Sequence, residues 1–189
     1  MGNVETNKEL FKSIVYNNIH REGIDDLMDW LETTDFYVAP ASTRFHGTNP
    51  GDLVAHSLEV YSRLKMKQTT ESDETIALVS LFHDLCKANF YEVSLRNTKD
   101  ENGKWIQVPF YTCRQDDPIP LGHGEKSMFI LMQHMKLSVE EASAIRWHMG
   151  GFVVEPQYEK PSLNSAMRQF KLVILLNQAD TEASFLSGK

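Results

Sequence analysis

Apolar residues recur along much of the chain at the three- and four-residue spacing of amphipathic helices. Asn49-Pro50 predicts the start of one helix, because asparagine caps helices and proline suits their first position. Ser138 and Glu141 have the spacing of a capping box, and Gly150-Gly151 predicts the end of the helix that this box begins. Helices are expected over residues 5–17, 25–31, 50–67, 72–84, 124–135, 138–149 and 165–184.

The helix expected from residue 72 contains the apolar segment 76–82. Asp73 and Glu74 lie in its first turn, where the helix dipole favours acidic side chains. Because residues 76–82 are apolar on nearly all sides of a helix, we expect this helix to be central and buried. His83 and Asp84 follow at its C-terminal end, which places two metal-binding side chains at the rim of the core.

Helical periodicity stops after this helix. Residues 90–95 and 105–112 alternate aromatic or β-branched residues with polar ones, and residues 99–104 have the composition of a turn. We therefore predict a β-hairpin insertion at about residues 89–113 in a mainly α fold. Its aromatic residues would suit stacking on a nucleobase, but packing of the hairpin onto the helices is the favoured interpretation.

Composition is that of a folded globular protein, with 189 residues, 41% hydrophobic and 24% charged. The expected organisation is one domain, with an N-terminal helical segment at 1–34 and a core at 35–187. Neither a membrane span nor a secretory signal is apparent, and the two cysteines form no Cys-x-x-Cys motif, so a cytoplasmic location is expected. The net charge of −7 disfavours nucleic acid as a partner, and the sequence does not define the oligomeric state.

Several histidines and aspartates fall in or at the ends of predicted helices, where rigid elements can direct them to a common point. Imidazole nitrogens and carboxylate oxygens are ligands of divalent metals, and a bundle of facing helices is a common place for such a site. His20 and His134 are expected to be packed or surface residues instead. The candidate metal ligands are His56, His83, Asp84, His123, His148 and Asp180.

The segments around these residues carry a family resemblance. AHSLEV at residues 55–60, LFHDLCK at 81–87 and LGHGEKS at 121–127 are followed by IRWH at 145–148 and NQAD at 177–180. Together they closely resemble the HD-domain phosphohydrolase superfamily, with its pattern H…HD…H…H…D, over about residues 35–187. The similarity is greatest to small bacterial and phage HD proteins that have a hairpin after the HD pair. The resemblance implies an HD-domain helical bundle.

The resemblance also implies a metal-binding arrangement. His56, His83, Asp84 and Asp180 would hold one metal. Asp84 would bridge to a second metal, bound by His123 and His148, and a dinuclear site is favoured over a mononuclear one. One or two divalent ions, among Mn, Fe, Co, Ni, Mg and Zn, are the expected cofactors. Three positions depart from the family pattern without removing a ligand, namely Gly51-Asp52, Met149 and Cys86. Cys86 is expected to be a small packed residue rather than a thiolate ligand.

The implied activity is hydrolysis of a nucleotide or other small phosphate ester through a metal-bound hydroxide. Asp84, Lys87 and Lys126 are the candidate catalytic residues. The helical spacing of Lys87 from His83, and of Lys126 from His123, would place each ammonium beside a ligand, where it would stabilise phosphoryl charge. Arg44, His46 and Arg146 are weaker candidates.

Two other functions are compatible with this ligand order. Some HD-fold enzymes are mixed-valent di-iron oxygenases, and imidazole and carboxylate serve iron as well as manganese. A nucleotide-binding or sensing module is the second alternative, although retention of all six ligands argues against it. A nucleic-acid phosphodiesterase is disfavoured by the acidic balance.

Overall fold

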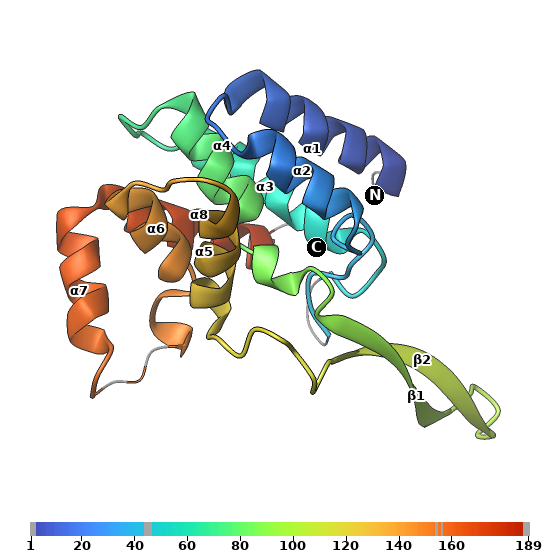
Figure 1. Ribbon diagram of the computed structural model, residues 1–189. Coiled ribbons are helices and arrows are strands. Elements are labelled where there is room, and N and C mark those ends of the chain that lie inside the picture. Colours follow the sequence, from blue (N-terminus) through green and yellow to red (C-terminus); the bar gives the residue numbers. More distant parts are fainter. Residues whose placement is uncertain (1–2, 44–46, 154, 156, 187–189) are drawn as a thin grey trace.

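The computed structural model describes residues 3–43, 47–153, 155 and 157–186, and this part contains eight α-helices and one antiparallel hairpin (Figure 1). The predicted mainly α class with one hairpin is confirmed. Short 3-10 helices at Leu85–Lys87 and Gly150–Val153 connect some of these elements. The elements are α1 (Val4–Asn18), α2 (Ile24–Glu32), α3 (Asp52–Met66), α4 (Asp73–Phe82), β1 (Tyr91–Lys99), β2 (Trp105–Cys113), α5 (His123–His134), α6 (Val139–Arg146), α7 (Lys160–Gln169) and α8 (Lys171–Leu186).

Helix α4 lies at the centre of the core, as predicted. All seven residues of its segment 76–82 are buried, and the helix contacts α1, α3 and α6. Phe82 packs edge-to-face on Phe11 of α1, with ring centroids 5.5 Å apart. Burying a large apolar side chain contributes about 1.5–3 kcal/mol, so this segment anchors the bundle. The end of α4, which carries the HD pair, is therefore held rigidly.

Helix starts follow the predicted capping with one exception, and the predicted helix end at Gly150-Gly151 is wrong, because α6 ends at Arg146 and Gly150 begins a separate 3-10 helix. The Ser72 hydroxyl accepts a hydrogen bond from the Thr75 backbone N–H, and Ser138 and Glu141 form the predicted capping box. Helix α3, however, begins at Asp52, after Gly51 with φ +81°, and not at Asn49-Pro50. The Asn49 amide groups instead donate to the Asp52 carboxylate, so this local bonding moves the start of the helix.

The C-terminal region differs from the single helix predicted over 165–184. It forms two helices, α7 and α8, because Phe170 between them has an extended backbone, with φ −127° and ψ 109°. The break frees α8 to lie against α3 and α6, while α7 contacts α8 at the edge of the bundle (Figure 1). Asp180 is buried in α8. The position of α8, which no local pattern specified, brings this aspartate to the histidines.

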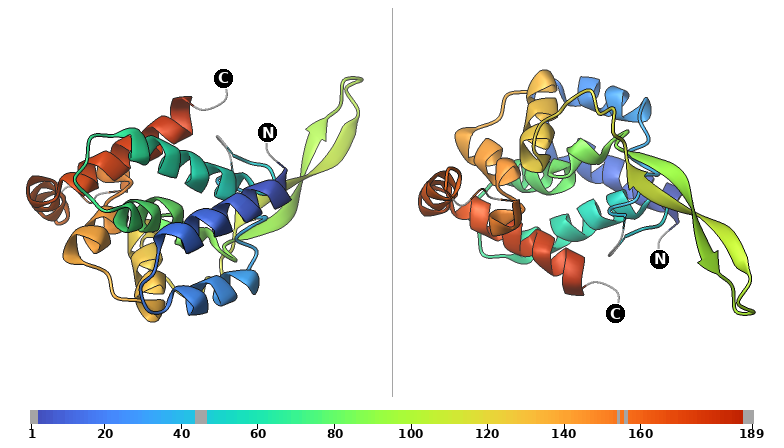
Figure 2. Two further views of the ribbon diagram at one scale, coloured as in Figure 1. Left: turned by 90° about the horizontal axis from the view of Figure 1, so that it is seen from above. Right: turned by 90° about the horizontal axis from the view of Figure 1, so that it is seen from below.

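The hairpin projects away from the helices in all views (Figures 1 and 2). The interpretation that it packs onto the helices is wrong for most of its length, because Val93, Leu95 and Trp105 are 64%, 63% and 66% exposed. At its base the Tyr91 hydroxyl donates to the Ala41 carbonyl, at 3.4 Å. Strands of nine residues extend about 30 Å, so the outer part of the hairpin lies beyond the helices.

None of the helices in the described part of the chain is long and apolar enough to span a membrane.

A partly buried ion pair links the connection between α1 and α2 to α6. The Arg21 guanidinium donates two hydrogen bonds to Glu141, at 2.9 and 3.0 Å, and Thr75 donates a third. Burial alone would raise the pKa of Glu141, but these donors and the Ser138 N–H lower it below its ordinary value near 4.5. Ionised Glu141 therefore stabilises the fold above that pH, and this contribution is lost as the pH falls through the lowered pKa.

Glu141→Gln is expected to lower the free energy of unfolding by about 2 kcal/mol at pH 7, since hydrogen bonds to charged groups contribute roughly that much. The difference from wild type should shrink as the pH falls below about 4.5. Urea unfolding at several pH values measures both effects. Glu22→Gln is the control, because Glu22 is exposed, and it should change little. A pH-independent loss in Glu141→Gln would contradict the assigned charge interaction.

Candidate metal centre

The structure brings together the six predicted ligands, which come from separate elements. His56 lies in α3, His83 caps the C-terminal end of α4, and Asp84 follows it. His123 is the first residue of α5, His148 follows α6, and Asp180 lies in α8. Three overlapping groups of these side chains have ligand atoms within 4.8 Å of one another, and together the groups include all six residues.

Two of the histidines are oriented by the backbone. The Nδ1 atoms of His83 and His148 lie 2.8 and 2.7 Å from the carbonyl oxygens of Ser80 and Ile145. A carbonyl only accepts, so each Nδ1 carries a proton, and in the neutral ring each Nε2 then presents its lone pair to the centre. Metal-binding histidines are oriented in this way, with the second ring nitrogen bonded to a carbonyl or carboxylate.

The Asp84 carboxylate lies between two sets of imidazoles. Its Oδ1 is 2.7 Å from His123 Nε2 and 3.6 Å from His148 Nε2. Its Oδ2 is 3.4 Å from His83 Nε2 and 3.7 Å from His56 Nε2. Each oxygen therefore faces a different pair of ring nitrogens.

Asp180 completes the set on the Oδ2 side. Its Oδ1 lies 3.1 Å from His56 Nε2 and 3.9 Å from His83 Nε2. The Nε2 atoms of His56 and His83 are themselves only 3.3 Å apart. Two imidazoles and two carboxylate oxygens thus face a small common volume.

The donor set fits a bound cation. His148 is fully buried, yet its Nε2 has no hydrogen-bond partner. An unpaired buried nitrogen costs about 1–3 kcal/mol, and a cation accepting its lone pair removes that cost. Nitrogen and oxygen donors of this kind suit Zn, Mn, Fe, Co and Ni. These buried His and Asp groups are therefore able to hold metal ions.

Both aspartates are ionised in this environment. Burial alone would raise the pKa of Asp84, but Lys87 and the surrounding imidazoles hold it well below its ordinary value. The pKa of Asp180 is likewise lowered to about 2, because the hydrogen bond from His56 and the nearby imidazoles outweigh burial. Burial lowers the pKa of His123 more than Asp84 raises it. Anionic carboxylates and a neutral imidazole are the protonation states that metal binding requires.

The cluster is not fully sealed from solvent. The His83 and His148 side chains are fully buried, whereas those of His56 and His123 are 12% and 26% exposed. The Asp180 side chain keeps 11% exposure. Three of the six side chains, from α3, α5 and α8, therefore remain partly accessible to solvent.

The two predicted catalytic lysines differ in position. The Lys87 ammonium lies 2.6 Å from Asp84 Oδ2, and this carboxylate raises the pKa of Lys87 despite burial. The Lys126 ammonium instead lies 2.5 Å from Asp117 Oδ2 and over the Phe90 ring, 5.0 Å from its centroid. Lys87 thus contacts the cluster directly, whereas the contacts of Lys126 hold the segment between the hairpin and α5.

Among the described residues, none of the weaker candidate side chains adds a positive charge to the cluster. Arg146 pairs with Glu125 and Glu159, and Arg44 and His46 lie outside the described part of the chain. His20 is exposed, and His134 packs near Trp30 with ring centroids 5.8 Å apart.

Cys86 is buried, as expected of a small packed residue, but no sequence pattern indicated its contact with His123 or the supporting roles of Ser127 and Asn177. Cys86 Sγ lies 3.3 Å from His123 Nδ1, and burial raises the pKa of this thiol to about 12, so Cys86 is a neutral neighbour of His123. The Ser127 hydroxyl accepts from the Cys86 N–H, and the Asn177 amide donates to the His148 carbonyl at 2.6 Å. The sequence places Asn177 three residues before Asp180, on the same helix. That Asn177 bonds to the His148 carbonyl depends on tertiary contacts.

Comparison with known proteins found no family model, no curated protein and no solved structure that matches this chain. The class that the fold and cluster define is a mainly helical protein with a buried His/Asp site able to hold metal. The resemblance to the HD superfamily rests on the sequence motifs and stays a prediction.

Proposed function

We propose that this protein is a metal-dependent phosphohydrolase of the HD type, acting on a nucleotide or another small phosphate ester. The observation that carries the proposal is the Asp84 carboxylate, whose two oxygens face separate sets of imidazoles. A single carboxylate placed in this way suits a bridging ligand between two cations. His56, His83 and Asp180 would hold one ion with Asp84, and His123 and His148 would hold the other.

Bound divalent ions would supply Lewis acidity and a water of lowered pKa for attack on a phosphoryl group. The chain itself supplies rigid orientation, because carbonyl acceptors fix the rings of His83 and His148. Lys87 keeps a cation at the cluster, where it balances Asp84 and would help to stabilise charge on a phosphate oxygen. His56 and His123 are partly exposed, so an incoming phosphate ester would reach these two imidazoles before the buried ones.

The test is phosphate release by the purified full chain from nucleoside mono- and triphosphates, cyclic nucleotides and simple phosphoesters, with each divalent metal added separately. We expect turnover that depends on added metal and is lost in His83→Ala. His20→Ala is the matched control, because this histidine is exposed and outside the cluster. Metal binding without hydrolysis of any phosphoester would contradict the proposal and favour a sensing module. Oxygen consumption with stoichiometric iron would favour the oxygenase.

His123→Ala tests the two-ion arrangement. Asp84 Oδ1 would then retain only His148 among its imidazole neighbours, so the bound metal should fall from two equivalents to about one. The helical circular dichroism should be unchanged, since His123 lies at the first residue of α5. Elemental analysis of the metal-loaded variant gives the number directly, and an unchanged stoichiometry would exclude this role for His123.

A further inference from the structure

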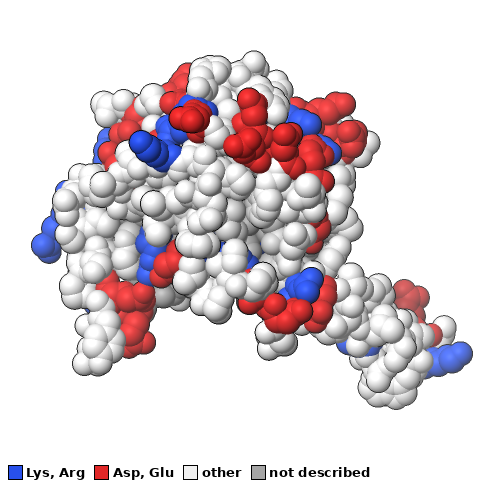
Figure 3. All heavy atoms as spheres, viewed as in Figure 1, with Lys and Arg blue, Asp and Glu red and all other residues white. Residues whose placement is uncertain are grey.

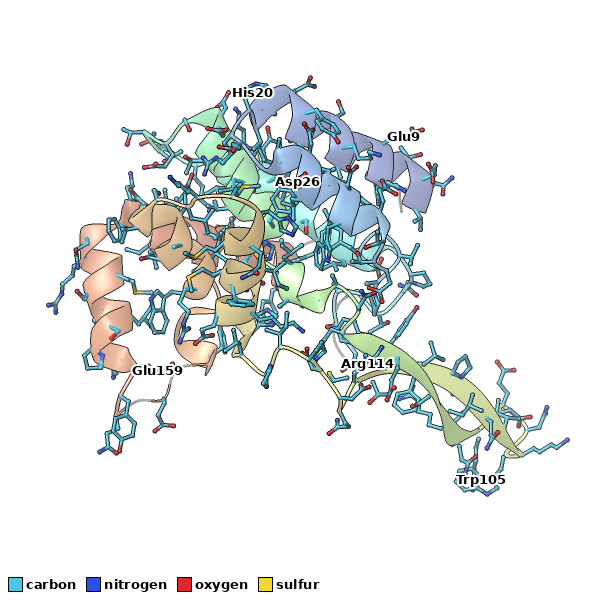
Figure 4. The ribbon with its side chains drawn as sticks, in the orientation of Figure 1. Glu9, His20, Asp26, Trp105, Arg114 and Glu159 are labelled. Carbon is cyan, nitrogen blue, oxygen red and sulfur yellow. The ribbon has the colours of Figure 1, made fainter. Side chains whose placement is uncertain are left out.

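The hairpin has one apolar face that no part of the described chain covers. Because side chains alternate along a strand, Val93 and Leu95 of β1 share a face with Pro109 and Trp105 of β2. All four are exposed. Trp105 lies near the far end of the hairpin and Arg114 at its base (Figure 4), and the hairpin surface in Figure 3 is mostly uncharged except towards its end. An isolated two-stranded hairpin is marginally stable in water, and three or more strands are normally needed.

The two outer edges of the hairpin differ in their capacity to pair with another strand. The Arg114 N–H donates to the Phe90 carbonyl, and the Asp100 N–H donates to the Lys104 carbonyl. Because hydrogen-bonded and non-hydrogen-bonded pairs alternate along the hairpin, the even-numbered residues of β1 direct their backbone groups towards β2. Odd positions of β1, and their partners in β2, therefore direct their backbone groups outward. Pro109, opposite Leu95, occupies such an outward position and has no N–H to donate. Proline at this position blocks the outer edge of β2. The outer edge of β1 contains no proline and is open.

The charged residues of β1 make its open edge complementary to the same edge of a second copy of the chain. Glu92 and Arg96 are exposed, and no ion pair in the described part of the chain involves either of them. Antiparallel pairing of β1 with a second β1, centred on Ser94, sets Glu92 of each copy opposite Arg96 of the other. The same register sets Val93 opposite Leu95 on the apolar face. Both residues direct their backbone N–H and C=O groups outward, so the two copies of β1 can hydrogen-bond to each other. Opposite charges and apolar residues in cross-strand pairs each stabilise a sheet.

Other registers lack this match. Pairing centred on Glu92 or on Arg96 would set like charges opposite each other, which destabilises a sheet. Pairing centred on Val93 or Leu95 would leave both charges opposite uncharged residues.

We propose that the protein forms a two-fold symmetric dimer through antiparallel β1–β1 pairing centred on Ser94, which joins two hairpins into one four-stranded sheet. The interface is isologous, so each Glu92–Arg96 contact occurs twice. The two helical bodies lie at opposite ends of the shared sheet, because the base of each hairpin pairs towards the far end of the other. This proposal is independent of the activity of the metal centre.

Sedimentation velocity of the full chain tests the proposed dimer. The protein is measured from about 2 to about 200 µM, the concentration range in which weak and transient interfaces form. Wild type should shift from monomer to dimer over this range. Arg96→Glu should weaken dimerisation about tenfold or more, because two attractive pairs become repulsive. Lys104→Glu is the matched control, since it makes the same charge change in the hairpin turn, and it should dimerise like wild type. A wild type that stays monomeric throughout would overturn the proposal.

Mixing distinguishes this register from a general effect of charge or folding. Glu92→Arg alone and Arg96→Glu alone should each be mainly monomeric. An equimolar mixture should form a heterodimer, because the two arginines of one chain then face the two glutamates of the other. The double variant carrying both substitutions should regain the wild-type affinity. Single variants that dimerise like wild type, or a mixture that does not associate, would show that the interface lies elsewhere or has another register.

Discussion

Asp84→Asn is expected to reduce phosphoester turnover about a thousandfold and to abolish stable metal binding. Its carboxylate is the only group that faces all four imidazoles of the described cluster, with its two oxygens 2.7–3.7 Å from their Nε2 atoms. Asparagine keeps the shape but loses the negative charge and one oxygen. Since metal catalysis contributes several kcal/mol to transition-state stabilisation, its loss corresponds to a rate effect of this size.

Initial-rate assays and elemental analysis of the same preparation give the two quantities together. Asp73→Asn is the matched control, because Asp73 lies at the opposite end of α4 with its side chain 66% exposed. It should retain both metal and activity. Full turnover in Asp84→Asn would exclude the proposed function, whereas lost activity with both metals retained would exclude a bridging role for Asp84.

Gly124→Ala is expected to lower the free energy of unfolding by about 2–3 kcal/mol and the melting temperature by roughly 5–10 °C. A Cβ on this residue would overlap the backbone carbonyl of Arg146 and lie 2.9 Å from that of Ile145. These atoms belong to the end of α6, so the methyl group forces α5 and α6 apart. His123 begins α5 and His148 follows α6, so the same displacement should weaken metal binding about tenfold or more.

Thermal unfolding by circular dichroism and metal titration measure the two effects. Gly151→Ala is the matched control, because a Cβ there would meet no atom of the described chain within 4 Å, and neither quantity should change appreciably. A Gly124→Ala variant with wild-type melting temperature would show that the α5–α6 contact adjusts without cost. Lost stability with unchanged metal affinity would show that this contact does not set the distance between His123 and His148.

Local sequence signals predicted most of the secondary structure. The capping box at Ser138 and Glu141 and the apolar segment 76–82 are short-range features, and the structure contains both as expected. The hairpin was also predicted from alternation and turn composition. Its second strand is close to the observed β2, whereas β1 continues four residues beyond the predicted end at residue 95. The break at Phe170 was missed, because the helical pattern continues across it and the position of α8 depends on packing against α3 and α6.

The types and order of the candidate ligands were determined by the sequence, since they follow from single residues and their motifs. Their convergence was decided by tertiary structure, because residues as distant as His56 and Asp180 meet only when α3 packs against α8. The same applies to Lys126, whose helical spacing from His123 suggested the cluster, whereas its ammonium binds Asp117 from the preceding loop. The exposed face of the hairpin also required the structure. Alternating residues define two faces of a strand, but only the arrangement of the whole chain determines whether either face is covered.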